Sequence, residues 1–451
     1  MNAVLEGLAS NPALPGYLLD RLVVHAELAA DLADRADLTP EHVRALLEHG
    51  DSSAVHRLLE KGLVHPADVP IADESVALVL TGHPDADPAL ARALAFHPDP
   101  AVREQLPEWA CALPADVVAL LARDPEPRVV AELVLFHPLP PGVPVSHADP
   151  AVRRALAASE HTPAAVLESL RSDGSLAREL AANPATPFAA DLLPHHESRY
   201  FLAARTDLPA EVYEQLASEL EPGTLATLAA NPSVPVPVLR QLAGTRTLRR
   251  ALLRNPSIPL DLLTDLAACA RIGPDLVPRI GSASAGELRA LAASGVAQVR
   301  MMVAMRPDLP PDVVALFLGD SDPGVVAAVA THPLVTVEEL RDLVSRHGPR
   351  VYPRAAANPL CPPELLHHMA LHAESVEKTF RAIARHPHAA GETLLLCLED
   401  AQARHFAAAH PNLPVPVIVE FLGSGFTAGA AAANPSLPVP VMEEIVGRNG
   451  L

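Results

Sequence analysis

Arginine is the residue type whose spacing in this chain could do binding chemistry. Between residues 240 and 306, ten arginines against four carboxylates give a local net charge of +6, whereas the whole chain carries −20. A guanidinium can hold a carboxylate or phosphate through two parallel hydrogen bonds, so the segment predicts docking of an acidic partner segment. The alternative interpretation is that these arginines pair with acidic side chains of adjacent parts of the chain. The candidate partner-binding residues are Arg246, Arg249, Arg250, Arg254, Arg300 and Arg306.

The densest part of this segment has helical spacing. Arg246 and Arg250 are four residues apart, as are Arg250 and Arg254. Residues four apart lie on one face of a helix, so a single helix through these positions would present the three arginines as a strip.

Histidines offer the only spacings that suggest metal binding. His368 and His372 are four residues apart, close to His367, and would share one face of a helix. Two ligands are too few for zinc, and no HExxH pattern supplies a catalytic glutamate. His195, His196 and Glu197 form a similar polar group that we assign to a turn. We expect no metal site.

Cysteines give no sign of a metal site or a disulfide framework. They are separated by more than thirty residues and form no CxxC pair, so we expect them to act as small buried apolar side chains. The four are Cys111, Cys269, Cys361 and Cys397.

No catalytic constellation emerges from the sequence. The patterns of nucleophile elbows, phosphate-binding loops and dinucleotide-binding turns are missing. The 54 carboxylates are spread along the chain, and no pair stands out as a general acid and base. We expect a protein that is not an enzyme and has no cofactor.

The elements that carry these residues must be short helices. Hydrophobic residues make up 49% of the 451 positions, aromatic residues only 3%, and there are 48 prolines. Proline lacks the amide hydrogen that a central strand needs but is tolerated in the first turn of a helix. No apolar run has the ~18–20 residues of a membrane span, and no basic segment leads into an apolar one at the start, so we expect a cytoplasmic protein.

A repeat of about 25 residues fills the chain. Its clearest copies read Asn-Pro-x-(Leu/Val/Ile/Cys)-Pro, and weaker copies bring the number of units to eighteen. The second proline of each copy, or its equivalent, is the anchor. The anchors are Pro15, Pro40, Pro66, Pro88, Pro114, Pro141, Pro163, Pro187, Pro209, Pro235, Pro259, Ser284, Pro310, Thr336, Pro362, Ala390, Pro414 and Pro438, of which those at 88, 284 and 390 are degenerate.

Two helices are predicted in each unit. Apolar residues at offsets of three, four and seven from the anchor mark one helix face, as in Val238, Leu239 and Leu242 after Pro235. A second helix is expected between anchors, where an acidic residue and a proline open segments such as 99–103, 149–153 and 322–326. Because the unit is short, we expect one of its two helices to be very short.

The position before the first proline of each unit is held by asparagine or histidine. Both types can hydrogen-bond a backbone group in a tight turn, and their 25-residue recurrence indicates a structural role. The residues are Asn11, Asn183, Asn231, Asn255, Asn358 and Asn434, with His83, His97, His137, His332, His386 and His410 elsewhere.

The Asn-Pro-x-Leu-Pro-x-x-Leu-Leu-x-x-Leu-Ala block, alternating with the Asp-Pro-x-Val-Arg block, resembles the leucine-rich repeat variant family. The resemblance implies an α-helix paired with a 3₁₀ helix in each unit, stacked into a right-handed α-solenoid without strands. Founding members bind an iron–sulfur centre through an N-terminal cysteine cluster; the first cysteine here is Cys111, so that cofactor is not carried over. We expect an all-α fold and one continuous solenoid over residues 1–451, with no separate catalytic domain.

Such an array predicts a non-catalytic scaffold that binds a protein or peptide on its extended curved surface. An alternative is a nucleic-acid-binding helical-repeat protein that uses the same arginines, and a weaker one is a redox protein. The charge of −20 and the few aromatic side chains disfavour nucleic acid. The last unit, which ends at Gly450 and Leu451, has no polar capping helix, so the terminal repeats could stack end to end.

Overall fold

The computed structural model describes residues 3–138, 148–187, 190–219, 221–269, 275–373 and 377–451. All regular structure in these ranges is helical, and none of their residues forms a strand. The prediction of an all-α helical-repeat fold is therefore confirmed.

The chain divides into two compact units. Unit 1 combines Met1–Arg35 with Leu253–Leu451, and unit 2 is Ala36–Leu252. Unit 1 thus takes its repeats from both ends of the chain.

One helix follows each described anchor, and we call it the first helix of its repeat. The three degenerate anchors begin helices as regular as the others, whereas Pro141 lies outside the described residues. Two first helices are 3₁₀ turns, η2 (Pro66–Asp68) and η4 (Ala190–Leu192). The others are α2 (Gly16–Leu22), α4 (Pro40–His49), α7 (Pro88–Ala95), α9 (Ala115–Leu121), α12 (Ala164–Leu170), α15 (Ala210–Leu216), α17 (Val236–Ala243), α19 (Leu260–Ala267), α21 (Ala285–Ala292), α23 (Pro311–Leu318), α25 (Val337–His347), α27 (Pro363–Leu371), α29 (Gly391–Cys397), α31 (Val415–Phe421) and α33 (Val439–Arg448).

A second helix precedes or follows each first helix. Four of these begin with a 3₁₀ turn: η1 (Ala26–Leu28), η3 (Gly174–Leu176), η5 (Arg246–Leu248) and η6 (Gly348–Arg350). The α-helical parts are α1 (Ala3–Ala9), α3 (Ala29–Ala33), α5 (Ser52–Glu60), α6 (Glu74–Thr81), α8 (Pro100–Trp109), α10 (Pro127–Phe136), α11 (Pro150–Ala158), α13 (Ala177–Ala182), α14 (His196–Ala204), α16 (Pro222–Ala230), α18 (Arg249–Leu252), α20 (Pro278–Gly281), α22 (Ala297–Ala304), α24 (Pro323–Val329), α26 (Tyr352–Ala355), α28 (Glu377–Ala384), α30 (Ala401–Ala408) and α32 (Ala428–Ala432).

The expectation that one helix of each pair is very short is wrong for much of the chain. The second helices α8 and α10 have ten residues each, as many as the longer first helices. Two full helices fit into one short repeat because the turns are short: only a few residues separate α8 from α9 and α9 from α10. Most described repeats are therefore pairs of α-helices rather than an α-helix with a 3₁₀ helix.

Proline acts differently at the two helix starts. The anchor prolines Pro235 and Pro259 are N-caps with ψ near 142–144°, one position earlier than the first helical turn in which the sequence placed them. In the second helices α8, α11, α16 and α24 an acidic side chain is the N-cap and proline follows it, as predicted for three of them. The Asp99 carboxylate, for example, accepts a hydrogen bond from the Ala101 amide at 2.9 Å.

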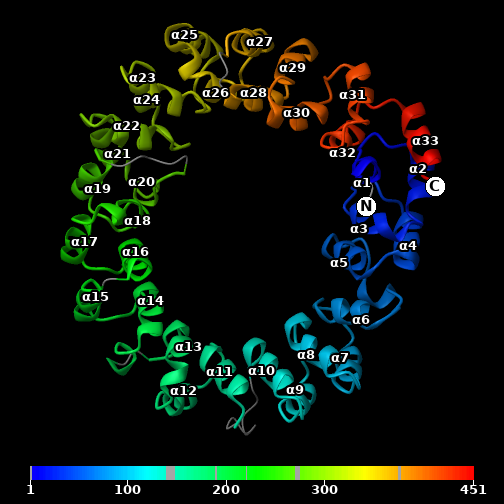
Figure 1. Ribbon diagram of the computed structural model, residues 1–451, viewed down its shortest axis with the longest axis vertical. Coiled ribbons are helices and arrows are strands. Elements are labelled where there is room, and N and C mark those ends of the chain that lie inside the picture. The colour runs from blue at the N-terminus through cyan, green and yellow to red at the C-terminus, as the bar shows by residue number, and fades with distance from the viewer. Residues whose placement is uncertain (1–2, 139–147, 188–189, 220, 270–274, 374–376) are drawn as a thin grey trace. The chain divides into compact units, whose positions relative to one another are not determined.

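The hydrophobic core lies between the layer of first helices and the layer of second helices. The predicted apolar faces are buried, as Val238, Leu239 and Leu242 of α17 show. Each such side chain contributes about 1.5–3 kcal/mol when fully buried. Within unit 1 the second helices α24, α26, α28 and α30 lie on the concave side and the first helices on the convex side (Figure 1).

The asparagine and histidine before each turn join adjacent repeats, which confirms their structural interpretation. The Asn434 Nδ2 donates to the carbonyl oxygens of Ala408 and His410, both at 2.8 Å, and its Oδ1 accepts from the Ser436 amide. His410 likewise bonds the His386 carbonyl through Nε2, at 3.0 Å. We call this position the slot. Slot side chains of this kind satisfy carbonyl groups of the preceding repeat that would otherwise be buried without a partner. Not every slot makes this contact: His97 Nε2 lies 3.4 Å from Glu74, and the described contacts include no partner for His332 Nε2. Other slots that bond preceding carbonyls are His137, Asn183, Asn231, Asn358 and His386.

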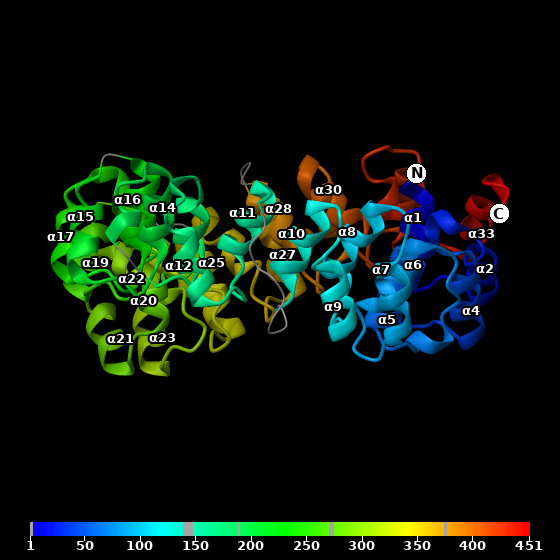
Figure 2. The ribbon, with the colours of Figure 1, turned by 90° about the horizontal axis from the view of Figure 1, so that it is seen from below.

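The first repeat packs on the last within unit 1, so the terminal repeats stack inside one chain. The Asn11 Nδ2 donates to the carbonyls of Ala432 and Asn434, both at 2.8 Å, as a slot residue does between consecutive repeats. Helix α1 packs on α32 with almost no space: a methyl group on Gly7 would overlap the Gly429 carbonyl. Both views show the N-terminal helix beside the C-terminal ones (Figures 1 and 2).

Candidate partner-binding surface

The densest arginine group lies on a short second helix and the turn after it. Leu248 and Leu252 are four residues apart and both buried, which directs the residues between them away from the core. Arg246 and Arg250 are exposed and Arg249 is half-buried. Leu252 ends unit 2, so Arg254 belongs to unit 1.

The single helix that would align three arginines does not form. The segment starts as the 3₁₀ turn η5, continues as the four-residue helix α18 and ends at Leu252. Asn255 and Pro256 open the next turn, and a residue before proline disfavours helical geometry. Arg254 therefore lies in the turn, exposed, and not one helical turn beyond Arg250.

The four clustered arginines have no acidic partner in the described part of the chain. No ion pair or side-chain hydrogen bond involves Arg246, Arg249, Arg250 or Arg254 among those residues. The interpretation that the arginines of this segment pair with neighbouring acidic side chains therefore does not describe these four.

Arg300 is held inside unit 1. Its Nε and Nη2 bond both carboxylate oxygens of Asp320, at 2.6 and 2.9 Å, and its Nη1 donates to the Ser294 carbonyl at 2.9 Å. The side chains are 16% and 7% exposed. This contact lowers the pKa of the Asp320 carboxyl, chiefly through the hydrogen bonds from Arg300.

Arg306 occupies a slot. Its Nη1 donates to the carbonyls of Ile280 and Ala283, at 2.9 and 2.7 Å, as an asparagine does elsewhere. Its Nε and Nη2 hold Asp308, which lowers the pKa of that carboxyl. Arg35 and Arg205 bond preceding carbonyls in the same way. Arginine is thus a third slot type that the sequence reasoning missed.

The other four arginines of residues 240–306 either have an interaction partner or lie outside the residues that the structure describes. Arg279 bonds Glu287 at 2.5 Å and Arg289 bonds Asp312 at 2.8 Å. Arg240 also has an interaction partner, so it is not a free cation. Arg271 lies outside the described residues.

Arginine–carboxylate pairs between repeats were not predicted. Each joins an arginine of a second helix to an acidic residue about twenty positions later, near the start of the next second helix. The detectable signal is this spacing, one arginine and one carboxylate per repeat. The pairs are Arg103–Asp124, Arg153–Asp173, Arg199–Glu219, Arg300–Asp320 and Arg381–Asp400.

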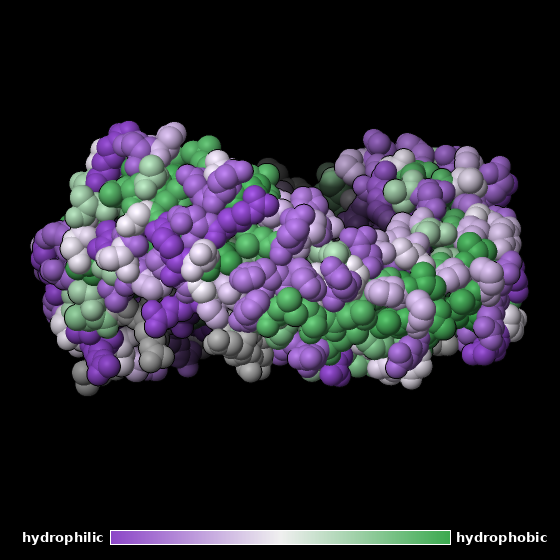
Figure 3. All heavy atoms as spheres, turned by 90° about the horizontal axis from the view of Figure 1, so that it is seen from above, coloured by the Kyte–Doolittle hydropathy of each residue, from purple (hydrophilic) through white to green (hydrophobic). Residues whose placement is uncertain are grey.

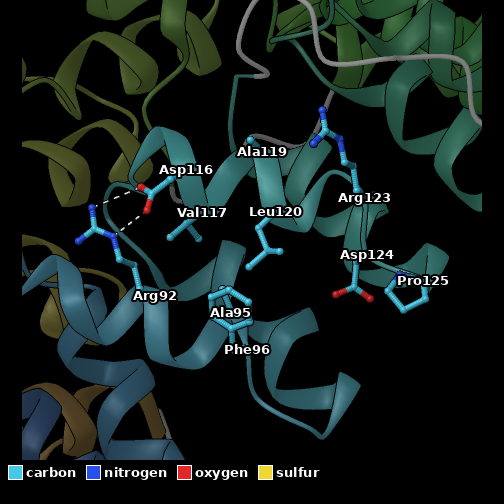
Figure 4. A pocket seen from close by; sticks show the side chains of 10 residues that line it. All are labelled: Arg92, Ala95, Phe96, Asp116, Val117, Ala119, Leu120, Arg123, Asp124 and Pro125. Carbon is cyan, nitrogen blue, oxygen red and sulfur yellow. Dashed lines mark hydrogen bonds and ion pairs between the residues drawn. The ribbon is translucent and has the colours of Figure 1, made fainter.

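A groove in unit 2 shows how such charges are usually balanced. It lies between α7 and α9, and Leu120 and Phe96 contribute apolar side chains to it (Figure 4). Arg92 in its wall bonds both carboxylate oxygens of Asp116, at 2.7 and 3.3 Å. Cation and anion lie in the same wall, so the groove has little local charge to offer a ligand.

The histidine groups form ordinary local contacts. His372 Nδ1 bonds the His368 carbonyl at 2.8 Å, and His367 Nδ1 bonds the Thr393 hydroxyl at 3.0 Å. His195 is the N-cap of α14, which begins at His196, so His196 and Glu197 lie in a helix and not in the predicted turn. The described residues contain no cluster of three side chains suited to a metal ion.

Two cysteines differ from expectation. Cys361 and Cys397 are buried, as predicted, and burial raises the pKa of each thiol to about 12. Cys111 and Cys269 are exposed, because each lies in a turn after a helix rather than on a buried face.

Among solved structures, the chain is similar to a crystal structure of a Kap121p mutant, with 12% sequence identity and a TM-score of 0.23. The similarity covers 98% of this chain and 51% of that one, so this chain spans about half the length of its match. A likeness this weak carries no argument about function. No family model and no curated protein matches the sequence.

The helices themselves define the class: the chain is a helical-repeat protein. In the part that the structure describes, no helix has the length and apolarity to cross a membrane.

Proposed function

We propose that this protein is a non-catalytic scaffold that binds an acidic segment of a protein partner. The contacts are Arg246, Arg249, Arg250 and Arg254. Arg300 and Arg306, the other two predicted contacts, can add charge to the surface, but their hydrogen bonds are already made to Asp320, Asp308 and backbone carbonyls.

One observation carries the proposal: the four clustered arginines have no described acidic partner, whereas Arg279, Arg289, Arg300 and Arg306 each do. Arg246, Arg249 and Arg250 in unit 2 are three guanidinium groups within five residues that have no described ion pair, on a chain of net charge −20. Charge-assisted hydrogen bonds to carboxylates would satisfy them.

Exposed aliphatic side chains support a protein partner. Leu334, Leu360 and Leu371 are about half exposed, and apolar side chains gather in a band between polar ones on the face seen in Figure 3. Protein interfaces combine such apolar areas with a polar rim. A nucleic-acid partner is the second candidate, but only 3% of the residues are aromatic and could stack on bases.

The proposal extends to the whole chain. We infer one repeat array over residues 1–451, of the leucine-rich repeat variant type suggested by its motifs, with no separate catalytic domain and a cytoplasmic location. The α/α pairing of most described repeats departs from the α/3₁₀ pairing implied by that resemblance.

The test compares partner capture by immobilised wild-type protein and by Arg249→Glu/Arg250→Glu, from native cell extract with and without nuclease. Arg123→Glu/Arg341→Glu is the matched control, because it makes the same charge change at two exposed arginines elsewhere in the chain. We expect a discrete protein that survives nuclease, is retained by the control and is lost with the first variant, while helicity and melting stay unchanged.

Two results would contradict the proposal. Equal capture by both variants would show that the cluster is not the binding surface. Capture of nucleic acid that falls steeply as salt rises would favour the second candidate.

A further inference from the structure

A second cationic site lies in unit 1, far along the chain from the arginine cluster. A cavity of about 720 Å³ opens between the second helices α26 and α28 of consecutive repeats. Four cations line it: Arg354, Lys378, Arg381 and Arg385. No described lining residue is acidic.

Three of these cations are available to a ligand. Arg354, Lys378 and Arg385 are exposed and have no described ion pair. Arg381 is paired with Asp400 at 3.5 Å. The buried His386 at the cavity wall adds no charge near neutral pH, because burial lowers its pKa.

Arg385 is positioned before any ligand arrives. Its guanidinium carbon lies 3.8 Å from the centre of the Phe406 ring, a cation–π contact from the residue after α28 to the next second helix, α30. This contact holds the side chain in one place but leaves its hydrogen-bond donors free. A fixed donor loses less conformational entropy when it binds an anion.

Comparable grooves of the chain contain carboxylates. The groove of Figure 4 includes Asp116 and Asp124 with its arginines. A third groove includes Glu197, Glu219 and Glu221, of which Glu219 pairs with Arg199. The cavity between α26 and α28 is the cationic exception among these three.

The walls between the cations are small and apolar. Ala356, Ala357, Ala382 and three prolines line the cavity. The one aromatic ring among its described lining residues, the imidazole of His386, is buried and therefore offers little surface on which a base could stack. Small aliphatic side chains fit such walls, and carboxylates fit the cations around them.

We propose that the cavity between α26 and α28 binds a second acidic peptide segment, in which carboxylates alternate with small apolar side chains. Arg354, Lys378 and Arg385 would hold the carboxylates. This site goes beyond the proposed function and does not depend on Arg246–Arg254.

Lysine is so rare here that it gives a direct test. The chain has two lysines, Lys61 and Lys378, both exposed. The probe is an N-acetylated, fluorescent peptide of alternating Glu and Ala, whose carboxylates are activated with carbodiimide before the excess reagent is quenched. An activated carboxylate held beside Lys378 forms an amide with its amine, and mass spectrometry locates the bond. Lys61 and the α-amino group report random reaction.

We expect amide formation mainly at Lys378. Arg354→Gln/Arg385→Gln should weaken binding of the unactivated peptide, measured by anisotropy, about tenfold and reduce the amide yield at Lys378. Lys378→Arg should keep the affinity and remove that amide. Arg249→Glu/Arg250→Glu, the variant that tests the proposed function, should leave the yield at Lys378 unchanged.

Equal labelling of Lys61 and Lys378 would overturn the proposal, as would labelling of Lys378 that is unaffected by Arg354→Gln/Arg385→Gln. Displacement of the peptide by a single-stranded oligonucleotide at lower concentration than by the unlabelled peptide would also overturn it. A melting curve of each variant separates loss of the site from loss of the fold.

Discussion

Arg300 distinguishes a framework role from a partner contact most sharply. The change Arg300→Ala removes two hydrogen bonds to Asp320 and one to the Ser294 carbonyl. It leaves Asp320, which is 7% exposed, with the amide of Asp322 as its remaining described hydrogen-bond donor, at 2.8 Å. A carboxylate that loses its cation in such a place is strongly destabilised.

We expect Arg300→Ala to lower the stability of its part of unit 1 by about 2 kcal/mol, the size of hydrogen bonds to charged groups. Arg289 provides the matched control, since it also holds both oxygens of one carboxylate, on Asp312, at 2.8 and 3.3 Å. Its side chain is 53% exposed and that of Asp312 58%. Arg289→Ala should cause no resolvable change, because water replaces an exposed pair readily.

The assay is hydrogen–deuterium exchange in low urea, which reports local opening of a repeat array that need not unfold in one step. Faster exchange in α22 and α24 is expected for Arg300→Ala and not for Arg289→Ala. Equal exchange in the two variants would refute the reasoning that burial sets the strength of these pairs. Loss of partner capture without faster exchange would show that Arg300 is a partner contact.

Three further predictions follow from other buried groups. Asn11→Ala should speed hydrogen–deuterium exchange in α1 and α32 and leave exchange in unit 2 unchanged. The control Ser10→Ala should change exchange in neither helix. Exchange in Asn11→Ala equal to that of the wild type would contradict the packing of the first repeat on the last. Burial lowers the pKa of His386 and His410 in the folded protein, so as the pH falls these side chains bind protons in the unfolded state before they do in the folded state. The free energy of unfolding should therefore decrease as the pH drops below about 6.5. Replacing both by asparagine, the other common slot residue, should reduce that fall, which urea melts at pH 7 and pH 5 would measure. Cys361 and Cys397, whose pKa values are raised to about 12, should resist a thiol reagent at pH 8 while the two exposed cysteines react; four rapid reactions would contradict their burial.

The sequence contained enough information to predict the local structure. Helix positions follow from proline and the apolar spacing, because both act within a few residues: Pro235 with Val238, Leu239 and Leu242 is one example. The slot role of asparagine could be predicted for the same reason, since its Oδ1 bonds an amide only two residues ahead, as in Ser436.

Contacts across repeats were harder to predict because they depend on how consecutive helices lie beside each other. Arg300 and Asp320 meet only because a second helix packs beside the turn that starts the next one. Arg306 fills a slot because its long side chain reaches the carbonyls that asparagine reaches with a short one. The sequence alone therefore did not separate these two from the unpaired cluster.

One local feature of the sequence indicates that the first and the last repeat pack together. Gly7 and Gly429 each lie inside a helix, where glycine often marks a close backbone approach. The contact itself joins the first and the last repeat, which lie far apart in the sequence, so no single repeat encodes it.

Packing of the first repeat on the last within unit 1 is tested most directly by the distance between the chain ends. Spin labels at Tyr17→Cys and Glu443→Cys, two residues joined by a 2.5 Å hydrogen bond, would report it by pulsed electron resonance once Cys111 and Cys269 are replaced by serine. We expect one short, narrow distance. Eighteen repeats in a linear stack, each about 9 Å thick, would separate the ends by on the order of 150 Å, and a long or very broad distribution would contradict the account.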